Sequence, residues 1–241
     1  MAERRYLNFP IAVIEDISAA KVTYETFLGP HNIFDGIMAY AVSEYANGNG
    51  CSIRAAAGYL GLKIVNAEDV QSEANEFIER YNCNVFTSLE TSIAYDFQNH
   101  KKKEFDFVVL AAHLACHSIV GKHPYSRVTK DLILSRMSGA AGLIEKTEYP
   151  YNVGKLDGPN GRRRWNKVLK TTCDIYGLKI YVPRGGRGYY MSYLLDSETL
   201  ATNVERMIAG KKARKAAKKT NAELREIALQ NLAAEAANCT P

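Results

Sequence analysis

The sequence predicts a mainly α-helical fold of the α+β class, in which small β-hairpins accompany the helices. Residues 34–62 and 105–139 follow one plan. Each begins with Phe-Asp, continues as an apolar-rich helix, breaks at Gly or Pro, and restarts at Ser or Thr. A third segment with apolar residues at helical spacing follows each of them, and a hairpin pattern follows the second set. Apolar residues make up 46% of the chain, so a core can form without disulfides or metal.

The start of the chain contains a short apolar run that is broken at Pro10 and ends at Glu15. We expect a short strand or turn there and not a signal peptide. No stretch approaches the roughly 20 apolar residues that a membrane span needs, so no membrane partner is expected. The five cysteines are dispersed and form no CxxC pair, which favours reduced thiols and a cytoplasmic location. Cys116 and Cys173 fall within apolar helical patterns, where buried side chains are expected.

Capping signals mark the helices of both segments. Asp35 and Asp106 lie in the first turn of the opening helices, where an acid suits the helix dipole. Ser52 and Thr129 are the predicted N-caps of the second helices. The shared plan predicts a repeat whose second copy has the longer loop.

The third helix of the first half, residues 67–81, is acidic. It carries five acids against Arg80 alone, and phosphate would be repelled by such a surface. We therefore expect the first half to serve as a dimerisation or partner surface. The predicted apolar face of this helix consists of Val70, Ala74, Phe77, Ile78 and Tyr81.

The third helix of the second half, starting at Arg162, is basic and is predicted to stop at Gly177. The runs "LKIYVP" and "YYMSYL" flank Gly185 and Gly186, and this pattern predicts a tight hairpin. The predicted buried face of the helix consists of Trp165, Val168, Leu169, Thr172, Cys173 and Tyr176.

Two further segments complete the chain. Residues 140–161 include "NVGKLDGPNG", whose Gly, Pro and Asn content predicts a long loop. The C-terminal part is expected to be helical in two pieces. One begins at Ser197, and the other follows Gly210 and the basic run, with Thr220 and Glu223 as its capping box.

The net charge of +5 is unevenly distributed. Residues 162–190 carry eight bases and one acid, and residues 211–219 carry six bases, which leaves a net −8 on the rest of the chain. Like charges destabilise an isolated helix, so we expect a polyanion to neutralise the two basic segments. Arginine and asparagine can also bond guanine and adenine edges. The candidate nucleic-acid-binding residues are Arg162, Arg163, Arg164, Asn166, Lys167, Lys170, Thr171, Arg184, Arg187, Lys211, Lys212, Arg214 and Lys215.

Simpler interpretations stay open for the same residues. A charge run can be a solvated helix face, and the basic face can instead dock an acidic protein partner. His113 and His117 are spaced i,i+4 with Cys116 and His123 nearby, but Leu114 stands where the zinc-protease motif has glutamate. We expect no metal and no cofactor. Phosphate-loop, dinucleotide and nucleophile-elbow motifs are missing from the sequence, so no enzymatic activity is expected.

The segments "SRVTKDLILSRMSG", "RRRWNKVLKTTCDIYG" and "LKIYVPRGGRGYYMSY" resemble the winged helix-turn-helix DNA-binding superfamily. The tandem plan is similar to that of plasmid and phage replication initiators. The resemblance implies two winged-helix-like modules, at 1–100 and 101–196, and a basic helical extension at 197–241. It implies double-stranded DNA as the partner, with single-stranded DNA or RNA as alternatives, and a homodimer through the N-terminal module. The expected role is replication initiation or transcription regulation in a mobile element; the alternative is a protein-interaction adaptor.

Overall fold

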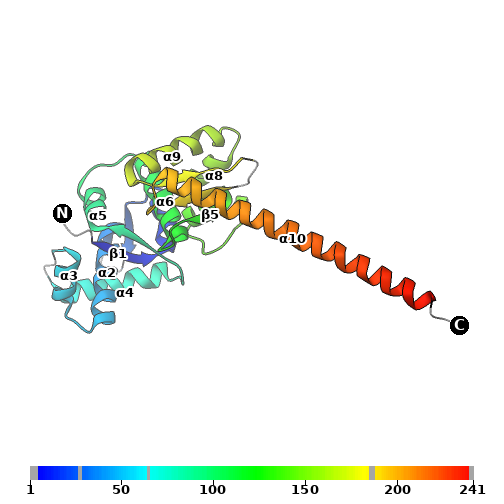
Figure 1. The fold of residues 1–241 in the computed structure, drawn as a ribbon. Coiled ribbons are helices and arrows are strands. Elements are labelled where there is room, and N and C mark those ends of the chain that lie inside the picture. Colours follow the sequence, from blue (N-terminus) through cyan, green and yellow to red (C-terminus); the bar gives the residue numbers. More distant parts are fainter. Residues whose placement is uncertain (1–4, 27–28, 64–65, 185–187, 239–241) are drawn as a thin grey trace.

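The structure is a computed structural model that describes residues 5–26, 29–63, 66–184 and 188–238 (Figure 1). It is mostly helical, with small antiparallel sheets, which confirms the predicted α+β class. The first half contains β1 (Tyr6–Pro10), the 3-10 turn η1 (Ile11–Val13), α1 (Ile14–Ser18), β2 (Thr23–Thr26), β3 (Gly29–Asn32), α2 (Ile33–Asn49), α3 (Ile53–Leu60), α4 (Ala67–Tyr81), β4 (Phe86–Glu90) and α5 (Thr91–Asn99).

The second half adds a three-stranded sheet to its helices. Its strands lie in the order β5-β7-β6 and are antiparallel, with Val128 opposite Tyr189 and Ile180 opposite Met191. Its elements are α6 (Glu104–Val120), β5 (Ser126–Val128), α7 (Lys130–Met137), the 3-10 turn η2 (Lys146–Glu148), α8 (Tyr151–Asp157), α9 (Gly161–Tyr176), β6 (Lys179–Tyr181), β7 (Tyr189–Ser192) and α10 (Ser197–Asn238).

The predicted N-caps at Ser52 and Thr129 are confirmed, whereas no helix begins at Thr220 because α10 runs through it. The Ser52 side chain accepts from the backbone N–H of Ala55 at 3.2 Å, and the Thr129 hydroxyl accepts from Leu132 at the same distance. α4 has the predicted bounds and buries Ala74, Phe77 and Tyr81. The opening helices α2 and α6 have 17 residues each, and the restarts α3 and α7 have eight each. The repeat itself stays a prediction.

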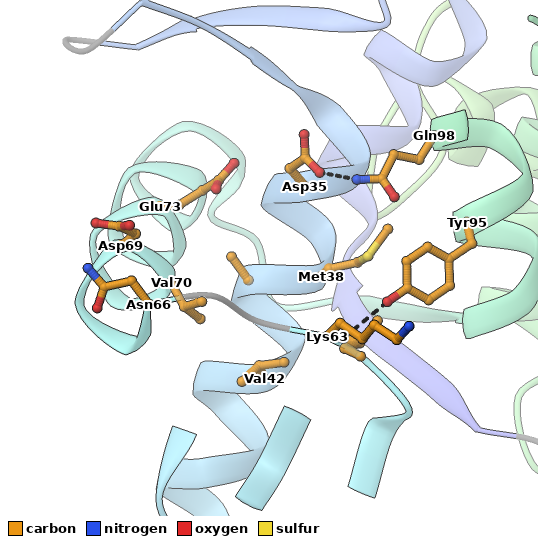
Figure 2. A pocket seen from close by; sticks show the side chains of 12 residues that line it. Asp35, Met38, Val42, Lys63, Asn66, Asp69, Val70, Glu73, Tyr95 and Gln98 are labelled. Atoms are coloured by element: carbon orange, nitrogen blue, oxygen red, sulfur yellow. Dashed lines mark hydrogen bonds between the residues drawn. The ribbon is translucent and has the colours of Figure 1, made fainter. Parts of the chain in front are cut away.

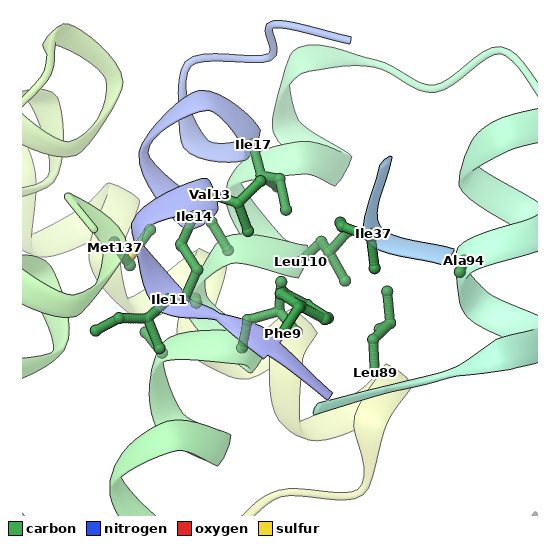
Figure 3. Close-up of a cluster of buried hydrophobic side chains, with 14 of the residues drawn as sticks. Phe9, Ile11, Val13, Ile14, Ile17, Ile37, Leu89, Ala94, Leu110 and Met137 are labelled. Carbon is green, nitrogen blue, oxygen red and sulfur yellow. The ribbon is translucent and has the colours of Figure 1, made fainter. Parts of the chain in front are cut away.

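The two halves share one hydrophobic cluster. The segment from β1 to α1 crosses it, and Phe9, Ile11 and Ile14 are fully buried there (Figure 3). Leu110 of α6 and Leu89 of β4 lie in the same cluster. In the first half the strand after α4 forms no hairpin, because β4 pairs with β1 at the opposite end of that half. One core is therefore shared by residues on both sides of the module boundary that the sequence suggests at residue 100.

Two predictions about the chain's irregular parts are wrong. Residues 140–161 are not one long loop, because α8 occupies Tyr151–Asp157 and buries Val153 and Leu156. The C-terminal part does not break at Gly210, because α10 is a single helix of 42 residues. One glycine costs about 1 kcal/mol in a helix, and its alanine- and lysine-rich surroundings offset that cost.

The first turns of α10 pack against the body. Leu200 and Val204 are fully buried against Tyr190 of β7, and the helix then projects away from the body (Figure 1). Within the described residues, no helix combines the length and apolarity needed to cross a membrane.

Candidate nucleic-acid interface

The N-terminus of α9 is held tightly against the end of α8. A Cβ at Gly161 would lie 2.4 Å from the carbonyl oxygen of Leu156, so only glycine allows this close approach. The ammonium of Lys130, on α7, donates to the same carbonyl at 2.7 Å and to Asp157 at 3.1 Å. The turn between α8 and α9 is therefore fixed from both sides, which sets where α9 begins.

The apolar face of α9 anchors it in the core. Trp165 is fully buried, and its indole N–H donates to the hydroxyl of Tyr189 on β7 at 2.9 Å. Val168 and Thr172 are buried on the same face. Gly177 ends the helix in the left-handed conformation, at φ 70°. The predicted buried face is confirmed, although Cys173 and Tyr176 at its C-terminal end are only partly buried.

The predicted basic residues lie on the opposite, outward side of α9. Among the described residues, no carboxylate forms an ion pair with the arginines or lysines of this helix. All of the predicted contacts on α9 are exposed except Thr171, which is half-buried. We call the following set the α9 basic face: Arg162, Arg163, Arg164, Asn166, Lys167, Lys170 and Thr171.

The first turn of α9 combines three features that favour an anion. Asn160 precedes the helix without a side-chain cap, the first turn contains no acid, and Arg162, Arg163 and Arg164 lie there. The positive end of the helix dipole thus coincides with three cations, which repel it. A phosphate at this end would accept hydrogen bonds from backbone N–H groups of the first turn that lack an intrahelical partner. It would also neutralise the charge of the arginines.

The other predicted contacts lie on two separate elements. Arg184 is exposed in the turn after β6, and Arg187 lies outside the described residues. The hydroxyl of Tyr181, on β6, donates to Glu205 and ties the hairpin to the first turns of α10. The basic positions of α10 are exposed on the projecting part of the helix, beyond the segment that packs on the sheet: Lys211, Lys212, Arg214 and Lys215.

Two neighbouring histidines of α6, the buried His113 and the half-buried His117, lie near the C-terminal end of α9. His113, on α6, stacks on the ring of Tyr176 at 4.1 Å between centroids, and its Nδ1 lies 2.9 Å from the hydroxyl of Tyr193. The same hydroxyl lies 3.2 Å from the backbone carbonyl oxygen of His113, to which it can donate. Burial lowers the pKa of His113 to about 3, with a smaller effect from the neighbouring His117. The pKa of His117 is lowered by its burial as well.

In the part of the chain that the structure describes, no group of three or more His, Cys, Asp or Glu side chains could hold a metal ion. Cys116, on the same helix, is fully buried, and burial raises the pKa of its thiol. Cys51, Cys83 and Cys173 are free thiols too.

The acidic hollow of the first half has the opposite character. It has a volume of about 310 Å³ and lies between α2, α4 and α5 (Figure 2). Asp35 accepts from the amide of Gln98, and burial raises its pKa. Glu73 bonds Nδ1 of His31 at 3.1 Å, and burial raises its pKa also. With exposed Asp69 beside them, these carboxylates would repel a phosphate.

Sequence reasoning missed the contribution of α8 to the interface. Asn152 and Lys155 on α8 line a hollow together with Arg164 and Lys167. A signal for the helix was present, since Tyr149, Val153 and Leu156 are spaced i, i+4 and i+7 and are buried. The glycine content of residues 140–161 is instead typical of a loop.

No family model, curated protein or solved structure matches this chain.

Proposed function

We propose that this chain is a non-enzymatic DNA-binding protein that uses the α9 basic face as a recognition surface. The carrying observation is that five bases on one side of a 16-residue helix lack acidic partners among the described residues. Apolar packing fixes the other side of α9. A rigid, unneutralised cationic helix is suited to phosphate and to the base edges of a major groove.

The arrangement around α9 supports a winged-helix interpretation of residues 101–196. The order α6, β5, α7, α9, β6, β7, with strands in the order β5-β7-β6, places a hairpin directly after the basic helix. In such modules the last helix enters the major groove and the hairpin contacts neighbouring backbone. Arg184 would serve that second contact. The inserted α8 makes the module longer than the simple plan.

The remaining elements take supporting roles in this proposal. The exposed bases from Lys211 to Lys215 would add salt-dependent affinity without sequence preference. The acidic α4 and the hollow beside it would face a protein, with a second copy of the chain as the partner. Replication initiation and transcription regulation in a mobile element both fit such a protein.

The test is binding of labelled random duplex DNA across a salt series, followed by fluorescence anisotropy. If about six phosphates are contacted, log K should fall against log salt with a slope near −5. Replacing Arg162, Arg163 and Arg164 together by alanine should flatten that slope by about 2 to 3.

A matched control removes the same charge elsewhere. Arg54, Lys101 and Lys122 are exposed and lie outside the α9 basic face, so their joint change to alanine should leave the slope nearly unchanged. If the slope of log K against log salt flattens equally in both triple variants, the effect comes from net charge alone, and the assignment of binding to α9 is overturned. If the chain binds no nucleic acid at low salt but co-purifies with an acidic protein, the adaptor function is favoured.

A further inference from the structure

Two adjoining hollows flank the first half of α9, and they differ in chemistry. One, of about 370 Å³, lies between α6, α8 and α9 and has an apolar floor that includes Phe105, Val108 and Val168. The other is polar and is lined by Asn160, Arg163, Arg164 and Lys167. Arg164 and Lys167 belong to both, so an apolar group and an anion attached to it could occupy the two together.

The wall of the apolar hollow includes Asn152, whose side-chain oxygen has no hydrogen-bond partner among the described residues. Asn152 is 9% exposed, and its side-chain N–H donates to the backbone oxygen of Ser18 at 3.1 Å. Its Oδ1 is buried and accepts no hydrogen bond from the described residues. Buried acceptors are nearly always satisfied in folded proteins, so this amide is an unusual, incompletely bonded group in the wall of the hollow.

Aromatic and cationic groups meet at the mouth of this hollow. The ammonium of Lys167 lies 4.7 Å from the centroid of the Phe105 ring. Lys155, on the other side, is 3.8 Å from Glu104 and covers Tyr151. Three cations, Lys155, Arg164 and Lys167, therefore line this hollow against the single carboxylate of Glu104, and the excess of positive charge favours an occupant with a negative end.

We propose that these paired hollows bind one unstacked nucleotide of a single-stranded nucleic acid. The base enters the apolar hollow against Phe105, and the phosphate lies by Arg163 and Arg164 at the start of α9. A nucleotide combines the planar apolar body and the attached anion that the two hollows require. The volume lies within the roughly 300–1,000 Å³ typical of small-ligand sites. This inference rests on the proposed function and adds a single-strand site to it.

The experiment compares two fluorescent single strands of equal length, one with bases and one with abasic sugars at its central positions. Because both carry the same phosphates, any difference in Kd reports the base. The base-bearing strand should bind about ten-fold more tightly, within the range for stacking of one base. Phe105→Ala should abolish this preference while the salt slope stays as in the wild type. Arg54→Ala is the matched control and should keep the preference.

Several outcomes would overturn the inference. Equal Kd values for the two strands in the wild type would do so without any variant, which covers the case in which Phe105→Ala fails to fold. A folded Phe105→Ala protein that retains the preference would do so as well. A free nucleoside monophosphate that binds more tightly than the strand would assign the hollow to a small molecule. If the duplex salt slope depends on the arginine triplet while the strands bind equally, the proposed function stands and only this site fails. Loss of all nucleic-acid binding removes both.

Discussion

Acidification should destabilise the folded protein through the buried imidazole of His113. In the unfolded chain this side chain gains a proton as the pH falls below its ordinary pKa of 6.5, whereas in the fold its pKa is about 3. The unfolded state therefore binds more protons between these values, and the free energy of unfolding decreases as the pH falls through this window. From about pH 7.5 to about pH 5 the loss from His113 is about 2 kcal/mol. The lowered pKa of His117 acts in the same direction.

The contribution of His113 is measured as a difference between two proteins. In His113→Phe the ring can still stack on Tyr176, and the hydroxyl of Tyr193 keeps the backbone carbonyl of residue 113 as its acceptor. Carboxylates such as Asp35, whose pKa is raised, titrate in both proteins and cancel. Urea unfolding at the two pH values can be followed by fluorescence of the single tryptophan, Trp165, which is buried in the fold.

The wild type should lose about 2 kcal/mol more than His113→Phe on acidification. For a chain of this size that difference corresponds to about 4–8 °C in Tm. If both proteins lose the same free energy between the two pH values, the imidazole is solvated or charged in the fold, and the burial argument is refuted. His123→Phe, at an exposed position without an ion pair to a described residue, is the matched control and should behave as the wild type.

Substitutions at four further positions test the positioning of α9, its neighbours and α10. Trp165→Ala should cost about 3–5 kcal/mol in urea unfolding followed by circular dichroism, and Trp165→Phe markedly less, because the cavity is smaller. Thr129→Ala should cost about 1 kcal/mol through the lost cap of α7, whereas Thr129→Ser keeps the hydroxyl and should cost little. Gly161→Ala should lower both Tm and DNA affinity, since its Cβ would clash with the Leu156 carbonyl. Gly210→Ala, where a Cβ meets nothing within 4 Å, should instead raise helicity, and a Tm drop there would contradict the account of α10.

Local signals predicted the helices whose chemistry is local. The caps at Ser52 and Thr129 and the apolar stripe around Trp165 depend only on residues a turn or two apart. The strand β5 depends on a partner far along the chain, because Ser126 pairs with Met191, and three residues carry too weak a pattern alone. The pairing of β1 with β4, with Tyr6 opposite Glu90, is distant in the same way.

In the candidate site too, some features follow from local sequence patterns and others depend on contacts between distant segments. The outward position of the α9 basic face follows from helical periodicity, and six of its seven residues are exposed, with Thr171 half-buried. The hollows beside it join Phe105, Asn152 and Arg164 from three helices, and their juxtaposition exists only after the core has formed. The predicted loop over 140–161 contains a helix because Tyr149, Val153 and Leu156 are buried at helical spacing, and this burial offsets the low helix propensity of the glycine and asparagine residues around them.

The uninterrupted course of α10 has a mechanical consequence. A helix of 42 residues is about 63 Å long, and each residue turns it by about 100°. Whatever engages its far end is therefore held at a set distance and at a set rotational phase relative to α9. Inserting one alanine after Gly210 would swing the far end by about 100° for a shift of only about 1.5 Å, whereas inserting seven would nearly restore the phase. The rotational phase of α10 is therefore more sensitive to a one-residue insertion than its length is, and this phase sets which side of the helix its far end presents.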